Sequence, residues 1–198
     1  MNRRCFDICT ALRRLCEDIS QRSMVFRHVD MNRVAVTYAQ TRSPVEWGMQ
    51  AKLTPMRFEK GAMTCVREGR RWGAQRLYQD GKEMLYILTF YLPRFLNLSL
   101  EEKLVTVFHE LYHISPAFDG DIRRFAGSCY MHTGSQADYD RQMAVYTKEY
   151  LAQLPKEQFP EYLQYDFAGL RRHYGMVVGL RLTVPRLIDL GESEGNAA

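Results

Sequence analysis

One capped segment near the middle of the chain restricts the fold more than any other. Ser99 is followed three residues later by Glu102, the capping-box pattern of a helix start. Ser115-Pro116 ends the pattern, because the residue before a proline resists the helical conformation. We therefore predict a helix over residues 100–114 that buries one face in a core. Its apolar residues recur at helical spacing: Leu104, Val107, Phe108 and Leu111.

Strand-like and helical patterns alternate along the rest of the chain. Alternating apolar residues predict strands in "RVAVTYAQ", "QAKLTPMRFE" and "GAMTCVREG", and the aromatic and β-branched run Met84–Leu92 predicts another. Helical spacing predicts helices over residues 4–20 and 137–154, and "GMVVGLRLTV" reads as a late strand. These patterns indicate an α+β fold with a mixed sheet of about four strands.

A length of 198 residues fits one domain, which we expect to span 1–198. Its core is predicted over about 24–154, with a C-terminal strand and flexible tail over 175–198. Charged residues interrupt the first twenty positions, and the run Met84–Leu92 is too short to cross a bilayer, so we expect a soluble, cytoplasmic protein without a membrane partner. An odd count of five cysteines indicates reduced thiols.

The predicted central helix carries the pattern H-E-x-x-H. Residues four apart lie on one helix face, so His109 and His113 can aim both imidazoles at one point. A catalytic zinc ion needs a third protein ligand and a water besides such a pair. Glu110 is placed to act as the general base on that water.

Spacing leaves the third ligand open. His132 follows His113 by nineteen positions and carries the imidazole that suits zinc, so it is the favoured candidate. A carboxylate would instead give two histidines and one acid, and five acidic residues are within reach: Asp119, Asp121, Asp138, Asp140 and Glu149. Three tyrosines near the site are candidates to donate a hydrogen bond to an oxyanion, and the sequence does not choose among Tyr112, Tyr130 and Tyr139.

The stretches "HELYHISPAFDGDIRRF" and "HTGSQADYDRQM" resemble a family of bacterial and phage metallopeptidases. That family's core reads HELxHI, then Phe-Asp-Gly, then a later histidine before an aromatic-Asp pair. More remotely the chain is similar to SprT-like zincins. The resemblance is strongest over residues 99–145, and Thr133 departs from a common glycine. It implies a compact zincin-like domain, with His109, His113 and His132 as zinc ligands and Glu110 as the catalytic carboxylate.

The expected function is therefore zinc-dependent hydrolysis of peptide bonds in a peptide or protein substrate. We expect the strand Met84–Leu92 to form the sheet edge beside the zinc and to hold an extended peptide. The alternative is a non-catalytic metal-binding or nucleic-acid-associated regulatory protein, in which the basic segment "REGRRWGAQR" at residues 67–76 contacts nucleic acid.

Overall fold

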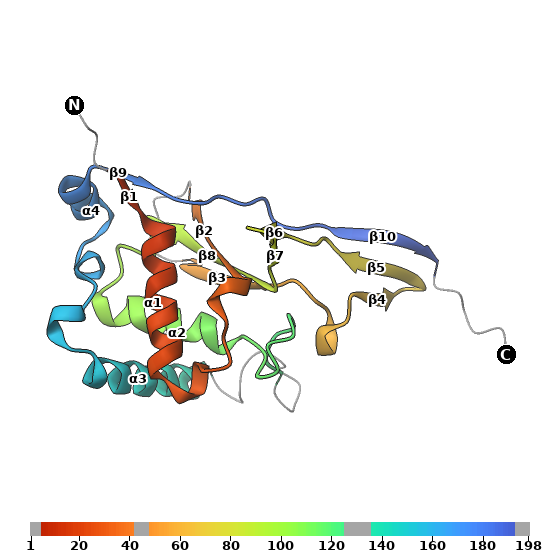
Figure 1. Ribbon diagram of the computed structural model, residues 1–198, viewed down its shortest axis with the longest axis horizontal. Helices are drawn as coiled ribbons and strands as arrows, with labels where there is room; N and C mark the ends of the chain where they lie inside the picture. The colour runs from red at the N-terminus through yellow and green to blue at the C-terminus, as the bar shows by residue number, and fades with distance from the viewer. Residues whose placement is uncertain (1–4, 42–47, 125–135, 193–198) are drawn as a thin grey trace.

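The computed structural model of this chain describes residues 5–41, 48–124 and 136–192. Within these ranges the helices are α1 Ile8–Arg22, α2 Leu100–Tyr112, α3 Gln136–Gln153 and α4 Phe167–Tyr174. The strands are β1 Cys5–Asp7, β2 Val34–Gln40, β3 Ala51–Pro55, β4 Thr64–Arg67, β5 Arg70–Ala74, β6 Tyr78–Gln79, β7 Lys82–Glu83, β8 Tyr86–Leu92, β9 Met176–Val178 and β10 Leu187–Glu192. The predicted α+β class is confirmed (Figure 1).

The central sheet is mixed and has the strand order β2-β8-β3. Strand β2 runs parallel to β8, and β3 runs antiparallel to it. The expectation of about four strands in one sheet was wrong, because the central sheet has three strands and the remaining described strands form three separate sheets, β10-β5-β4, β1-β9 and β6-β7.

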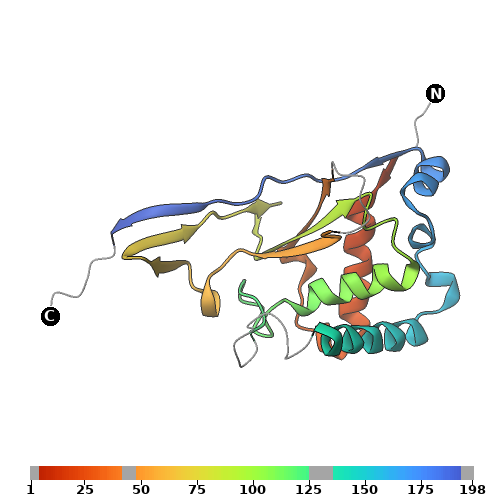
Figure 2. The same cartoon turned by 180° about the vertical axis from the view of Figure 1, so that it is seen from behind.

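The predicted position of the strand around Met84–Leu92 also needs correction. Strand β8 lies in the middle of the sheet, so its backbone is paired on both sides and cannot accept a further strand. The nearly continuous apolar run of β8 fits this central position, because a strand that is buried on both faces has apolar residues at almost every position. The edge strand packed beside α2 is β3, as seen from behind in Figure 2.

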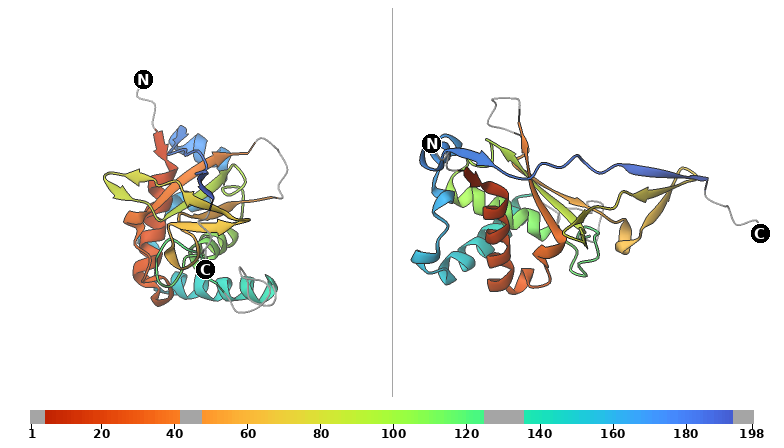
Figure 3. Two further views of the ribbon diagram at one scale, coloured as in Figure 1. Left: turned by 90° about the vertical axis from the view of Figure 1, so that its right-hand side faces the viewer. Right: turned by 45° about the horizontal axis from the view of Figure 1, so that its top comes forward.

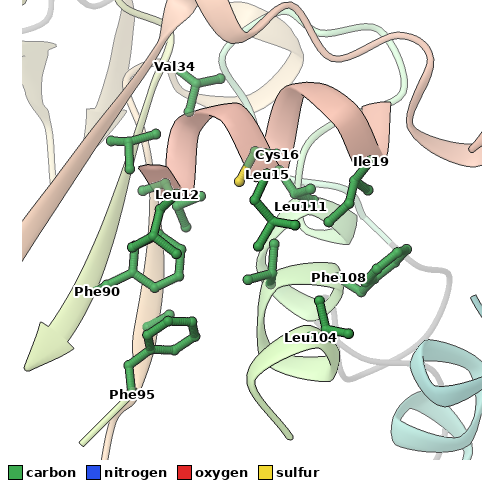
Figure 4. Close-up of a cluster of buried hydrophobic side chains, with 14 of the residues drawn as sticks. Leu12, Leu15, Cys16, Ile19, Val34, Phe90, Phe95, Leu104, Phe108 and Leu111 are labelled. Carbon is green, nitrogen blue, oxygen red and sulfur yellow. The ribbon is translucent and has the colours of Figure 1, made fainter. Parts of the chain in front are cut away.

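The two faces of the central sheet are covered differently. One face packs against α1 and α2 and forms the main core with them. Residues of this core that Figure 4 labels are Leu12, Leu15, Cys16, Ile19, Val34, Phe90, Phe95, Leu104, Phe108 and Leu111. The opposite face carries a smaller cluster of Ala35, Met56, Met84 and Ile87. The main core extends past α3 to Tyr162, Leu163 and Leu170, so segments before 24 and after 154 also contribute to it.

Helix α2 begins as predicted, and its end is held by the segment that follows. The Ser99 hydroxyl accepts from the Glu102 amide, and the Glu102 carboxylate accepts from the Ser99 amide. At the other end, the Arg123 amide donates to the His113 carbonyl at 2.7 Å and the Arg123 Nε donates to the Tyr112 carbonyl at 2.8 Å. These bonds satisfy two of the carbonyls that a helix end leaves open.

Two segments differ from their predicted boundaries. Helix α1 begins at Ile8, because Cys5–Asp7 instead pairs in parallel with β9. Of the predicted late strand, only β9 is formed, and β10 lies beyond its predicted end and pairs with β5. Strands β4, β5 and β10 together form an arm that extends away from the helices (Figures 1 and 3).

Of the cysteines, Cys9 and Cys16 are buried, Cys65 is half-buried and Cys5 is exposed, while Cys129 lies outside the described residues. Cys9, Cys16 and Cys65 are free thiols, in agreement with the prediction. None of the helices in the described ranges is long and apolar enough to cross a membrane.

A carboxylate near the base of the arm joins two arginines from different segments. Glu83 accepts from Arg76 at 2.7 Å and also pairs with Arg57, whose side chain is 7% exposed. The hydrogen bond from Arg76, together with the Arg57 guanidinium, lowers the pKa of Glu83 from 4.5 to about 2. Since the Arg57 amide also donates to the Gly120 carbonyl, this pair ties the end of β3 to the loop after α2.

We predict that Glu83→Gln lowers the free energy of unfolding by about 2 kcal/mol at pH 7, because it leaves a buried guanidinium without its counter-ion. Because the pKa of Glu83 is lower in the folded protein than in the unfolded chain, its ionised carboxylate stabilises the fold at pH values above the unfolded pKa. This contribution is lost as the pH falls from about 4.5 to about 2. The difference between variant and wild type should therefore shrink when urea unfolding is repeated at pH 4 and pH 3. Glu17→Gln, in the more exposed pair with Arg13, is the control and should change stability by less than about 0.5 kcal/mol. A Glu83→Gln deficit that is the same at pH 7 and pH 3 contradicts the prediction.

Candidate metal centre

The two histidines of α2 lie side by side, as their spacing predicts. Their ring centroids are 4.7 Å apart and the ring planes meet at 76°. Both side chains are half-buried. Tyr139 of α3 is 2% exposed and contacts both rings, with centroid distances of 4.7 Å to His109 and 5.8 Å to His113. Packing of α3 against α2 therefore restricts how both imidazoles can turn.

Glu110 points from α2 toward the sheet. Its side chain is buried, and its Oε2 accepts a hydrogen bond from the Leu53 amide of β3 at 2.6 Å. Burial raises the pKa of Glu110 to about 7, opposed by that hydrogen bond and by the charge of Lys52. A carboxyl group with a pKa near neutrality can both accept and release a proton at physiological pH.

The register of β3 shows that the Leu53 amide belongs to the free edge of the sheet. Just outside the two ends of β3, the Tyr91 amide donates to the Gln50 carbonyl and the Met56 amide donates to the Leu85 carbonyl, so the backbone groups of even-numbered residues of β3 face β8. The backbone groups of odd-numbered residues therefore point to the free edge of the sheet. Pro55, which has no amide hydrogen, occupies one of these positions. Glu110 thus binds the edge strand at its outer side.

A catalytic zinc site needs three protein ligands, and the described residues bring two imidazoles together. Adjacent imidazoles one helical turn apart fit nitrogen coordination of one ion. Within residues 5–41, 48–124 and 136–192, no group of three His, Cys, Asp or Glu side chains is placed to hold a metal ion. The favoured third ligand, His132, lies outside the described residues.

Several of the alternative acidic ligands are engaged elsewhere. The Asp121 carboxylate accepts from the amides of Lys60 and Ile122 and from the Arg124 guanidinium, and Asp119 accepts from the Asp121 amide within its own turn. Glu149 is exposed on α3, ten residues after Tyr139, and this separation is about 15 Å along a helix axis. The side chains of Asp138 and Asp140 are outside what the structure describes.

A pocket of about 500 Å³ opens beside His109 and Glu110. We call it the α2 pocket. The start of β3 and the first turn of α2 line its other side, with Gln50, Ala51, Glu101 and Glu102. An extended molecule held along β3 can therefore place a group in this pocket while it passes over Glu110.

Sequence reasoning did not find the partner of Glu110. Leu53 lies 57 residues before it, and the contact uses a backbone amide, which carries no side-chain signal. Tyr139 was one of three tyrosine candidates, and its hydroxyl donates to the His109 carbonyl at 3.4 Å, so its described contact is with the helix that carries the histidines. Tyr112 instead lies under the Arg123 guanidinium, 4.1 Å from its ring centroid. Tyr130 lies outside the described residues.

Comparisons of the chain with family models, with curated proteins and with solved structures found no match.

Proposed function

We propose that this protein is a zinc-dependent metallopeptidase of zincin type, with His109, His113 and His132 as the metal ligands. The observation that carries the proposal is the pairing of two adjacent imidazoles with a buried carboxylate on one helix, beside a pocket. Each part has a chemical counterpart in peptide hydrolysis: two nitrogen ligands, a proton acceptor and a space for substrate.

Zinc bound at this pair would polarise a carbonyl oxygen and make a bound water acidic. Glu110 is the residue that accepts a proton from the attacking water and passes it to the leaving amine. Its burial and raised pKa suit both transfers, because the group must be a base in one step and an acid in the next. Tyr139 positions the imidazoles by contact with both rings.

The substrate strand is assigned to the outer edge of β3, in place of the edge first expected at β8. Among the described residues, the outward backbone groups of Ala51 and the Leu53 carbonyl have no hydrogen-bond partner. An extended peptide can pair with such an edge by β-augmentation. Its passage past Leu53 brings a peptide bond close to the Glu110 carboxylate.

A regulatory role in association with nucleic acid is less well supported. In the segment at residues 67–76, Arg70 is paired with Asp189 of β10, and Arg76 is paired with Glu83. These pairs reduce the positive charge that the segment offers to phosphates. A cytoplasmic location remains a prediction from the sequence.

We predict that purified protein binds about one zinc ion per chain, and that His132→Ala weakens zinc binding far more than Glu149→Ala. A lost imidazole ligand should raise the zinc dissociation constant by at least about 100-fold, whereas Glu149 lies too far along α3 to coordinate. Elemental analysis and competition with a chelating dye give the two measurements. Absence of stoichiometric metal, or the reverse ranking of the two variants, contradicts the proposed centre.

We predict that Glu110→Gln keeps the zinc and the fold but slows peptide hydrolysis by about 10³-fold. Glutamine matches the shape of glutamate and can still accept from the Leu53 amide, yet it cannot take a proton from water. Cleavage of a peptide library, zinc content and thermal unfolding are compared for the wild type, this variant and the Glu149→Ala control. A zinc-loaded Glu110→Gln protein that cleaves as fast as wild type would show that another group is the base.

A further inference from the structure

A second pocket, of about 540 Å³, lies at the far end of β3. We call it the arm pocket. Its walls come from three places: the end of β3 and the residues after it, the loop after α2, and the inner face of the arm. Thr54, Pro55 and Met56 belong to its lining, just as Gln50 and Ala51 belong to the lining of the α2 pocket. The same strand edge therefore leads from one pocket to the other.

The two pockets carry opposite charge. The lining of the α2 pocket includes Glu101 and Glu102, with no lysine or arginine among its described residues. The Glu102 carboxylate is fixed by the capping box, and hydrogen bonds from Ser99 lower its pKa, so it stays ionised at neutral pH. Glu101 is exposed and has no ion-pair partner in the described part of the chain.

Four arginines line the arm pocket, against two carboxylates, Glu59 and Asp121. Two of these arginines are neutralised, since Arg57 pairs with Glu83 and Arg124 pairs with Asp121. The other two, Arg67 of β4 and Arg186 just before β10, have no ion-pair partner among the described residues. Both residues belong to the lining of the pocket and both are exposed, so their charges can be reached by an anionic group.

We propose that the outer edge of β3 binds an extended peptide segment of asymmetric charge, with a basic side chain in the α2 pocket and an acidic side chain in the arm pocket. This inference rests on the proposed function, of which it names the substrate class. Apolar residues of the α2 pocket, Leu98, Val105 and Ala144, suit the methylene stem of a lysine or arginine.

The length of β3 determines the spacing of the two charges. Ala51 touches the first pocket and Pro55 the second, and four residues of a strand span about 13 Å. A peptide paired with β3 advances at the same rise, so its basic and acidic residues lie about four positions apart. Glu110, which binds the Leu53 amide, lines the α2 pocket itself, so the bond to be cleaved lies next to the basic residue and on the side that faces the acidic one.

Peptide binding tests the inference separately from catalysis. Two fluorescein-labelled peptides share one neutral sequence and carry a lysine and a glutamate four positions apart. The lysine comes first in one peptide and the glutamate comes first in the other. A reference peptide carries glutamine at both positions. Anisotropy is measured with full-length Glu110→Gln protein, and mass spectrometry confirms that the peptides stay intact. We expect one of the charged orders to bind about 10-fold more tightly than the reference. If neither order binds more tightly, the inference is overturned.

Charge reversal identifies the pocket. Arg67→Glu and Arg186→Glu should each weaken binding of the preferred peptide about 10-fold, and a peptide with lysine in place of its glutamate should recover affinity for these variants. Arg71→Glu is the matched control, because Arg71 pairs with Val66 and so faces the opposite side of the same hairpin. Equal weakening by all three variants, or no recovery with the lysine peptide, overturns the assignment of the arm pocket.

The failure of this inference and that of the proposed function are distinguishable. If the protein binds peptides with charge selectivity but neither binds zinc nor cleaves peptides, the inference about the edge of β3 is supported and the proposed peptidase function is contradicted. If the protein cleaves peptides in a zinc-dependent way but shows no charge preference, the proposed function is supported and the inferred substrate class is contradicted.

Discussion

Helix α2 is buried on most of its circumference, and the rest of the structure is arranged around that constraint. Leu104, Val107, Phe108 and Leu111 are each fully buried in the main core. On another side Lys103 is 2% exposed, and its ammonium group donates to the Leu163 and Tyr165 carbonyls. Burial of a lysine is tolerated because both hydrogen bonds replace water. A helix held on these sides cannot rotate, so the half-buried stripe through Val105, His109 and His113 keeps its direction.

The hydrogen bond between Glu110 and the Leu53 amide joins this helix to the sheet edge. A carboxylate with almost no access to water is unfavourable unless a donor replaces the lost solvent. The outward amide of an edge strand is such a donor, and it is unpaired by the geometry of β3 itself. A single donor offsets only part of the cost of burial, which is why the pKa of Glu110 is raised and not lowered. The same contact that positions the carboxylate therefore keeps it near the pKa of a general base.

Local features were predictable from the sequence, and long-range pairing was not. The capping box at Ser99 and the facing histidines depend on residues within a few positions of one another, and the structure has them as predicted, while α2 ends at Tyr112, two residues before its predicted end. The place of β8 depends on which strands pair with it, and β2 and β3 come from a distant part of the chain. A buried strand reads the same at several places in a sheet, so its pattern could not distinguish the centre from the edge. The pairing of β10 with β5 joins residues more than a hundred positions apart, and such a long-range contact leaves no local signal in the sequence.

The position of the arm after β3 suggests why its exposed surface is tolerated. A three-stranded sheet that extends from the body leaves apolar side chains such as Val66, Ile188 and Leu190 exposed on its outer face, which is unfavourable in water. Its inner face, however, forms one wall of the arm pocket and carries Arg67. The chain runs from β3 through the short 3-10 helix Glu59–Gly61 into β4, with no other strand between β3 and the arm in the sequence. On the proposed function, the arm would extend the binding surface of a short edge strand, whose five residues offer few backbone hydrogen bonds to a peptide.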